Sequence, residues 1–289
     1  MNNIFGMVTI KNTNSYTDLA LKSFFKNTPI KKDDDFFLID NDGCETEKFS
    51  TYGEIKIIKN NNPLNFAENV NQVIDIAIKN KKDLIFLTND LIFTEDWIKP
   101  VLLNSSSISI PSNNQIFQYQ SDCENLKLKI TMNFNDFNEN YDLLNIIAKK
   151  HKRKFNPNQK FQTLLMPFSC FKIPYEILNQ VGYLDTSYGT GGGEDVDYRI
   201  KCAIKGHEVN FLIDSYLMHF HGKSTWGAET RKQTEERNKK YTEVFLKKWG
   251  HDLTQIFILR KDFESILKKK NLEELFKKGK FGDLIRKLY

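Results

Sequence analysis

The chain has 289 residues, of which 40% are hydrophobic and 27% are charged, proportions typical of a soluble globular protein rather than a disordered one. No apolar run approaches the roughly 18 residues that a membrane-spanning helix needs. The first residues show neither the cationic region nor the apolar region of a secretory signal. The four cysteines are widely separated, which favours reduced thiols in the cytoplasm over a disulfide or zinc framework.

The net charge of +5 is concentrated at one end of the chain. Residues 260–289 contain ten Lys or Arg against five Asp or Glu, so this segment carries the whole excess and the rest is neutral overall. A domain that binds nucleic acid usually carries an excess of positive charge, and the main part of this chain carries none. The charge therefore indicates a basic appendage and excludes nucleic acid as the partner of the main domain.

Short apolar runs alternate with helical patterns over the first hundred residues. Strands are expected at 4–10, 36–39, 55–58 and 83–87, and helices at 18–25 and 66–78. Strands that are continuous apolar runs separated by helices predict an α/β fold, with a parallel sheet covered on both faces. In such sheets ligands bind at the carboxyl ends of the strands.

Polar residues follow three of these strands and should line one rim of the sheet. They are Lys11, Asn12, Asp40, Asn41, Asn89 and Asp90. A carboxylate such as Asp90 is a suitable ligand for Mg²⁺ or Mn²⁺ bridging a diphosphate, because these cations prefer hard oxygen donors. The same residue could instead cap the loop or the next helix.

The pattern weakens from about residue 102 to residue 161 and becomes regular again beyond it. The basic run 149–154 in this region is interpreted as a solvated loop or helix end, with a contact to acceptor or phosphate as the alternative. Three glycines, 191–193, precede a helix expected at 194–205. Such a run indicates a close approach of backbone to a ligand, or a mobile loop. Acidic residues in the first helical turn are stabilised by the helix dipole. A carboxylate at this position could also act as a general base.

His219 and His221 alternate at the end of an expected strand at 216–220, so their side chains should point to opposite faces. Either histidine could be a ligand or a structural residue.

Taken in order, these segments resemble glycosyltransferase family 2, inverting enzymes of the GT-A fold, over roughly residues 4–250. The second-strand pattern is Phe-Leu-Ile-Asp-Asn-Asp-Gly at 37–43, and Leu-Thr-Asn-Asp at 87–90 stands at the Asp-x-Asp metal motif. The other matching segments are 10–12, 65–71, 193–199, 219–224 and 247–250. Thr88 replaces the first Asp of the metal motif and Asn65 replaces a Gly, which leaves Asp90 as the main carboxylate ligand.

The resemblance implies a metal-dependent inverting glycosyltransferase with a nucleotide-sugar donor linked to UDP, dTDP or GDP. It implies Asp195 as the base, Glu194 as a residue that orients Asp195 or the acceptor, and a cation at Asp90 and His219. An imidazole ligand favours Mn²⁺ over Mg²⁺. The residues implied in donor nucleotide binding are Ile10, Lys11, Asn12, Asp40, Asn71 and Asn89. The expected acceptor is a hydroxyl of a glycan or of a lipid-linked glycoconjugate, as in polysaccharide biosynthesis.

Two other functions are weighed against this one. A sugar nucleotidyltransferase shares the sheet type but needs a Gly-rich phosphate loop with Arg and Lys after the first strand, and residues 11–14 offer none. A non-catalytic carbohydrate- or nucleotide-sugar-binding GT-A protein remains the alternative, against which the presence of Asp90, Asp195 and His219 argues.

The expected organisation is a nucleotide-sugar-binding half at 1–100, an acceptor and catalytic half at 101–250, and a basic amphipathic helical tail at 251–289. Within the tail, apolar residues recur at helical spacing among lysines. The tail could dock on the domain, bind a partner helix, or lie on an anionic membrane through residues 260–289. The membrane hypothesis places the protein in the cytoplasm, peripherally on the inner membrane face, and expects the domain to survive truncation after Leu259.

Overall fold

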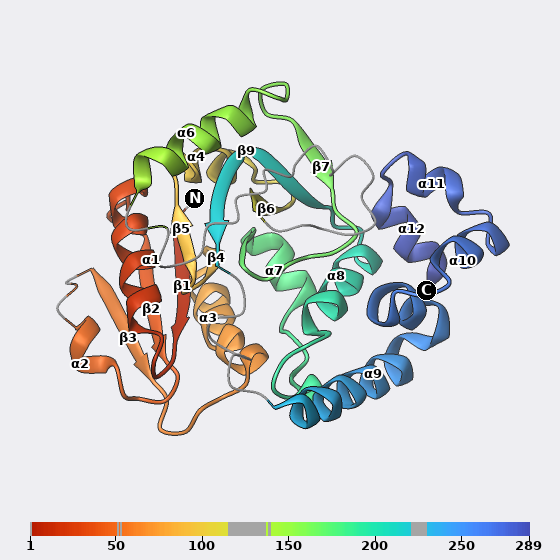
Figure 1. Cartoon of the computed structure of the whole chain (residues 1–289), viewed down its shortest axis with the longest axis horizontal. Helices are drawn as coiled ribbons and strands as arrows, with labels where there is room; N and C mark the ends of the chain where they lie inside the picture. The colour runs from red at the N-terminus through yellow and green to blue at the C-terminus, as the bar shows by residue number, and fades with distance from the viewer. Residues whose placement is uncertain (1, 51, 53, 115–136, 138–139, 221–229) are drawn as a thin grey trace.

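The computed structural model describes residues 2–50, 52, 54–114, 137, 140–220 and 230–289. In this part of the chain one mixed sheet of nine strands forms the centre of the molecule, with helices on both faces (Figure 1). The strands are β1 (Asn3–Thr9), β2 (Asp35–Asp40), β3 (Ile55–Lys59), β4 (Asp83–Thr88), β5 (Leu91–Phe93), β6 (Ile108–Asn113), β7 (Lys160–Gln162), β8 (Cys170–Ile173) and β9 (Val209–His219). The α/β architecture expected from the alternating pattern is confirmed.

The order of strands is β3-β2-β1-β4-β8-β6-β9-β5, with β7 paired to β9. β1 to β4 are parallel, as the apolar runs predicted, and β6 and β9 are also parallel. β8 runs antiparallel to β4, and β5 and β7 run antiparallel to β9. The carboxyl ends of β1, β2 and β4 therefore meet at one edge of the sheet, where ligands bind in this architecture.

The helices have the following bounds. They are α1 (Asn14–Asn27), α2 (Thr46–Phe49), α3 (Phe66–Asn80), α4 (Ile98–Leu103), α6 (Tyr141–Lys152), α7 (Tyr175–Val181), α8 (Glu194–Ile204), α9 (Arg231–Thr254), α10 (Phe263–Lys269), α11 (Glu273–Lys277) and α12 (Phe281–Leu288). Asn65 begins α3 with a capping box, in which its side chain accepts from the Glu68 N–H and the Glu68 carboxylate accepts from the Asn65 N–H. Asn65 thus acts here as a helix cap.

Alternate residues of the strands supply two separate hydrophobic cores, one on each face of the sheet. Ile4 of β1 packs in the core that α3, α7 and α8 cover, whereas Phe5 packs in the core that α1 and α4 cover. This alternation follows from the two-residue period of a strand. One expectation needs correction: the strand expected at 216–220 is the end of a longer strand, β9, from Val209 to His219. β6 pairs with β9 at Val209–Leu212 and again at Tyr216 and Leu217, with a shift of register between Pro111 and Ser112.

The C-terminal helices α10, α11 and α12 pack on the domain through their apolar face. Leu284 and Ile285 of α12 are fully buried in a core shared with Ile200 of α8 and Phe245 of α9. The Arg286 guanidinium also donates to the backbone carbonyl of Ala203 at 2.8 Å. Of the alternatives weighed for the tail, the structure shows docking on the domain.

Within the described residues, none of the helices combines the length and the apolar character that crossing a membrane requires.

Candidate functional site

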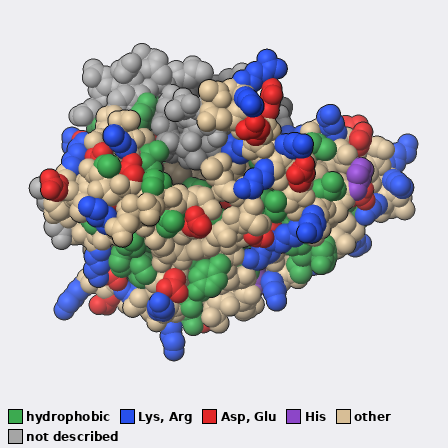
Figure 2. Space-filling view, turned by 90° about the horizontal axis from the view of Figure 1, so that it is seen from below, with side chains coloured by type: hydrophobic (Ala, Val, Ile, Leu, Met, Phe, Trp, Pro, Cys, Tyr) green, Lys and Arg blue, Asp and Glu red, His purple; other side chains and the backbone are tan. Residues whose placement is uncertain are grey.

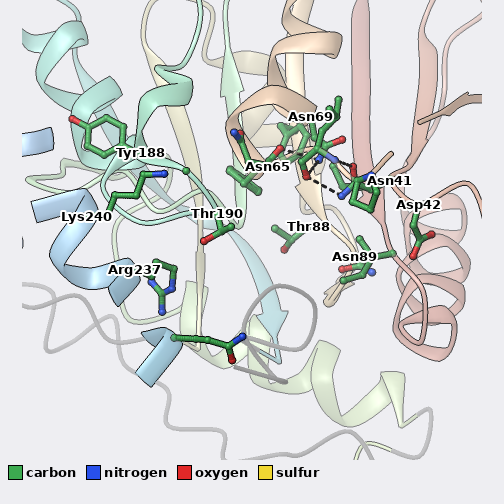
Figure 3. A pocket seen from close by; sticks show the side chains of 18 of the residues that line it. Asn41, Asp42, Asn65, Asn69, Thr88, Asn89, Tyr188, Thr190, Arg237 and Lys240 are labelled. Carbon is green, nitrogen blue, oxygen red and sulfur yellow. Dashed lines mark hydrogen bonds between the residues drawn. The ribbon is translucent and has the colours of Figure 1, made fainter. Parts of the chain in front are cut away.

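A cleft with a volume of about 930 Å³ opens at the carboxyl ends of β1, β2 and β4 (Figure 3). The N-terminus of α3 forms part of its wall, and the glycine loop and α9 lie on the opposite side. The lining residues are Val8, Ile10, Asn41, Asp42, Pro63, Leu64, Asn65, Phe66, Asn69, Phe86, Leu87, Thr88, Asn89, Tyr188, Gly189, Thr190, Gln233, Glu236, Arg237 and Lys240. Of the six residues predicted for the rim, Asn41 and Asn89 belong to this lining, and the cleft is large enough for a nucleotide sugar.

A network of side-chain amides holds the wall between β2 and α3. Asn60 donates to the carbonyl oxygens of Asn41 and Asn69 at 3.0 and 2.9 Å, and its own oxygen accepts from Gln72. Asn41 in turn accepts from the Leu64 N–H and donates to the Leu64 carbonyl. Buried amides that hydrogen-bond to one another hold the segments that carry them in place. This network therefore fixes the loop that carries Leu64 against the cleft.

Of the two aspartates after β2, Asp42 lines the cleft and Asp40 does not. Asp40 is fully buried, and its Oδ2 accepts from the Glu45 N–H and the Thr46 hydroxyl at the start of α2. Its Oδ1 has no hydrogen-bond partner in the described part of the chain. Asp42 accepts from the Lys11 N–H at 2.8 Å and so ties the turn after β1 to the turn after β2.

Some of the other residues predicted to bind the donor line the cleft, and others lie away from it. Ile10 and Asn89 line the cleft, and the Asn89 amide donates to the hydroxyls of Thr13 and Thr17 at 2.9 Å each. Asn12 adopts a left-handed backbone conformation, with φ of 69°, in the turn beside them. Asn71 is placed elsewhere: its side chain exchanges two hydrogen bonds with the backbone of Leu184, joining α3 to the loop after α7.

The two predicted metal ligands lie together. Asp90 lies in the two-residue turn between β4 and β5, and His219 ends β9. Because β5 pairs with β9, the His219 Nε2 lies 3.1 Å from the Asp90 Oδ1. Both side chains are largely buried. Burial, and to a smaller extent the charge of Asp90, raises the pKa of Tyr16 on α1. A carboxylate oxygen and an imidazole nitrogen form a donor set that suits Mn²⁺.

The described residues contain no cluster of three or more His, Cys, Asp and Glu side chains that could hold a metal ion. Asp90 and His219 would thus be two ligands of a shell completed by water and diphosphate oxygens, as is common for cations that bind with a nucleotide. His221 and the following residues of the His-x-x-Gly-x-Ser segment lie outside the described residues.

The glycine loop is explained by packing against α9 as well as by its place at the cleft. Gly192 has φ of 112°, and a Cβ atom there would lie 2.7 Å from the ring of Tyr241. A Cβ on Gly193 would lie 3.0 Å from the ring of Tyr188. Only glycine allows this backbone conformation and this approach together.

Glu194 and Asp195 begin α8 directly after this loop. The Glu194 carboxylate accepts from the Gly192 N–H at 2.6 Å, and Asp195 accepts from the Val196 N–H at 2.8 Å. Burial raises the pKa of both carboxyl groups, and the neighbouring Asp195 raises that of Glu194 further. Neither side chain is among the residues that line the cleft, which the loop enters through Gly189 and Thr190.

Sequence reasoning missed the contribution of α9 to the cleft. Gln233, Glu236, Arg237 and Lys240 line it, and Arg237 donates to the Gly191 carbonyl at 3.5 Å. Figure 3 shows Arg237 and Lys240 across the cleft from Asn41 and Asp42. Because α9 is polar on nearly all sides, no periodic signal distinguished the residues that face the cleft from those that face solvent.

Asp197, which follows the catalytic candidates, joins α8 to α9. Its Oδ1 accepts from the Tyr188 hydroxyl, the Trp249 indole N–H and the Lys248 ammonium at 3.0, 2.8 and 2.6 Å. Lys248 also pairs with Asp185. Two of the sequence segments noted above, 193–199 and 247–250, thus meet in one buried cluster, and Asp197 has a structural role there.

A scan against protein-family models gives no match for this chain, and neither does a search of curated proteins. Solved structures do resemble it. GalNAc-T7 with UDP, GalNAc and Mn²⁺ has a TM-score of 0.60 and 16% identity, over 89% of this chain and 49% of that one. TarS 1–349 from S. aureus with UDP-GlcNAc has a TM-score of 0.56 and 13% identity, over 95% of this chain and 71% of that one.

A mannosyltransferase, PcManGT from Pyrobaculum calidifontis in complex with GDP-Man and Mn²⁺, has a TM-score of 0.51 and 11% identity. It matches over 85% of this chain and 63% of its own. The chain thus spans about half of GalNAc-T7 and less than two thirds of the mannosyltransferase. At these identities the likeness concerns the fold, and the fold is that of GT-A glycosyltransferases, as the resemblance in the sequence implied.

Proposed function

We propose that this chain is a glycosyltransferase that uses a nucleotide-sugar donor and a divalent cation, and that it acts with inversion, as the resemblance to family 2 implies. The observation that supports it most directly is the juxtaposition of Asp90 and His219 immediately after the cleft-lining Asn89. The three similar structures named above contain UDP, UDP-GlcNAc or GDP-Man, and two contain Mn²⁺. This chain combines the same fold with a cleft and a metal-compatible donor set where such ligands would bind.

The nucleoside would occupy the end of the cleft between Asn41, Asp42 and Leu64. The Oδ1 of Asp40 lies just behind this wall as an acceptor for a base N–H, provided that the wall adjusts to admit it. Arg237 and Lys240 supply positive charge on the opposite side, where an anionic group of either substrate would be stabilised. A cation bound by Asp90 and His219 would neutralise the diphosphate leaving group.

Transfer needs a base for the acceptor hydroxyl, and Asp195 is proposed for this role with Glu194 as its neighbour. The acceptor oxygen would lose its proton to the carboxylate and form a bond to the anomeric carbon, while the bond from that carbon to the diphosphate oxygen breaks. A carboxyl group whose pKa is raised is a stronger base in its charged form, which supports the assignment. The acceptor would approach beside Gly189 and Thr190, where the glycine loop reaches the cleft.

Ligand-induced changes in melting temperature test the donor site. UDP, dTDP or GDP should stabilise the protein in the presence of Mn²⁺, by about 2.7 kcal/mol at a hundred times the dissociation constant, because the ligand binds only the folded state. Asp90→Ala and His219→Ala should each remove the Mn²⁺-dependent part and leave binding of the free nucleoside nearly unchanged.

His207→Ala is the matched control, because His207 lies in the loop after α8 and contacts Gln180. If no nucleoside diphosphate shifts the melting temperature with Mn²⁺, or if the two site variants respond like the control, the proposed donor site is wrong. Release of nucleoside diphosphate from the bound donor then separates an enzyme from a protein that only binds nucleotide sugars.

A further inference from the structure

Helix α6 has one face packed on β9 and another that remains exposed. Leu144, Ala148 and His151 are buried, and the His151 ring contacts that of Tyr216 on β9, tilted by 45° with 5.0 Å between the ring centroids. Leu143 and Ile146, by contrast, are 39% and 50% exposed. Large apolar side chains in line on a helix surface are unusual unless something covers them.

The same exposed face continues into a run of cations. Leu143, Ile146, Lys150 and Arg153 recur at spacings of three and four, so they follow one another along one side of the helix. Residues 149–154 contain five Lys or Arg and no acidic residue. Lys149 pairs with Glu95 at 3.0 Å, whereas Lys150, Arg153 and Lys154 are exposed and have no ion pair with a described residue.

The C-terminal tail, the other basic segment, has no comparable face. Most of its apolar residues, including Leu284 and Ile285, are buried in a core shared with α8 and α9, and its exposed surface is made mainly of charged side chains of both signs. Figure 1 shows α6 at the upper left and the tail helices α10 to α12 at the right, well apart from one another. Figure 2 shows Lys and Arg side chains over both halves of the face seen from below, including the side where the tail helices lie. The two basic surfaces can therefore be tested independently.

We propose that the exposed face of α6 (Leu143, Ile146 and Lys150), together with Arg153 and Lys154 directly after the helix, binds an anionic lipid surface. Exposed apolar side chains beside a cluster of lysines and arginines match both parts of such a surface, its acyl boundary and its phosphate headgroups. A polyanion such as RNA would be attracted by the charge alone and would make no use of Leu143 and Ile146. This inference concerns a surface separate from the cleft and does not depend on the proposed function.

Co-sedimentation of the full-length protein with vesicles tests the proposal. Binding is expected to phosphatidylcholine vesicles that contain phosphatidylglycerol and not to pure phosphatidylcholine, and to weaken as salt rises, because salt screens charges near a surface. The triple variant Lys150→Glu, Arg153→Glu, Lys154→Glu should bind on the order of 100-fold more weakly, from the loss of three cations at the surface.

The matched control is Lys268→Glu, Lys269→Glu, Lys277→Glu in the tail. It changes the net charge by the same amount, at exposed positions that make no ion pair with a described residue, so it should retain most of the binding. A second variant, Leu143→Ser with Ile146→Ser, keeps every charge and should still lose several-fold in vesicle affinity. Melting temperatures near that of the wild type show that all three variants fold.

Three results would overturn the proposal. The wild type could fail to sediment with anionic vesicles at low salt. The α6 and tail triple variants could lose binding equally, which would leave only net charge as the cause. The Leu143 and Ile146 variant could bind vesicles like the wild type while the protein also binds RNA, which would identify a general polyanion surface.

Discussion

Two adjacent carboxyl groups, Glu194 and Asp195, begin α8 in surroundings that disfavour their charged forms. Burial is the main cause of the raised pKa of each, and their proximity raises that of Glu194 further. Perturbed carboxyl groups of this kind cluster at functional sites, although structural networks also produce them. Asp197, two residues on, illustrates the structural case, since three donors surround it.

Replacing Asp195 by Asn should reduce sugar transfer by about 100-fold or more and leave nucleoside diphosphate binding intact, because a base acts in the chemical step. In the wild type, transfer should fall as the pH drops through the raised pKa of the carboxyl group, since only the charged form accepts a proton. This loss should occur at a higher pH than an ordinary aspartate would give. The measurement is the steady-state rate as a function of pH.

Asp33→Asn, at an exposed position before β2, is the control and should leave both the rate and its pH profile unchanged. If Asp195→Asn transfers sugar at the wild-type rate, Asp195 is not the base. Glu194 would then be the candidate, and Glu194→Gln the variant to measure.

Helix α9 lines the cleft with its first half and is joined to α8 by its second half. Its first half lines the cleft through Gln233, Arg237 and Lys240, and Tyr241 packs on the glycine loop. Its second half is joined to α8 by Lys248 and Trp249, both of which contact Asp197. The cleft wall and the start of α8 are thus held by one helix, so a change in the second half should affect both.

Lys248→Met should lower the free energy of unfolding by about 3 kcal/mol, because it leaves the fully buried Asp197 carboxylate without its cationic partner. Denaturant unfolding measures this loss. Lys247→Met, next along the chain and exposed, is the matched control and should change stability by less than about 0.5 kcal/mol. Equal stability of the two variants would show that solvent compensates Asp197 and that the cluster does not hold α9.

At the scale of the whole molecule, the C-terminal segment completes the core beside α8. The sequence pattern, apolar residues among lysines at helical spacing, describes a helix that buries one face without showing what that face packs against. In the structure that face lies on α8 and α9, and α12 also bonds to Ala203 through Arg286. Membrane contact by residues 260–289 stays a prediction, and it would have to rely mainly on charged side chains, because most apolar residues of the segment are buried.

Leu284→Ala should destabilise the protein by about 2–5 kcal/mol, the cost of a cavity in a packed core, because Leu284 is fully buried. Leu246→Ala on α9 is the control: Leu246 is 46% exposed and its loss should cost far less. Thermal or denaturant unfolding compares the two. By the same reasoning, truncation after Leu259 should leave α8 with an exposed apolar face and a domain that melts at much lower temperature.

A truncated chain that melts like the full-length protein, together with a Leu284→Ala variant as stable as the wild type, would show that α12 contributes little to the core. The segment would then be an appendage, as its charge suggested.

The sequence by itself determined the alternation of strands and helices, because a buried parallel strand and an amphipathic helix each have their own period of apolar residues. It also placed Ile10, Asn89 and Asp90 at the ends of strands, which in a parallel sheet lie at one edge. The resemblance to family 2 assigned Asp90 and His219 to one site, and their side chains lie together in the structure. The strands, helices and strand ends are recorded in local patterns of the sequence.

Only the tertiary structure decided which way Asp40 and Asn71 point, that α9 lines the cleft, and that the tail docks on α8. Each of these depends on packing between segments far apart in the chain. Asp40 turns to the start of α2, and Asn71 turns to the backbone of Leu184, because buried polar groups take whatever partner the fold brings within reach. A helix that is polar on nearly all sides, such as α9, has no periodic pattern of apolar residues from which its neighbours could be predicted. Its role is therefore visible only in the folded structure.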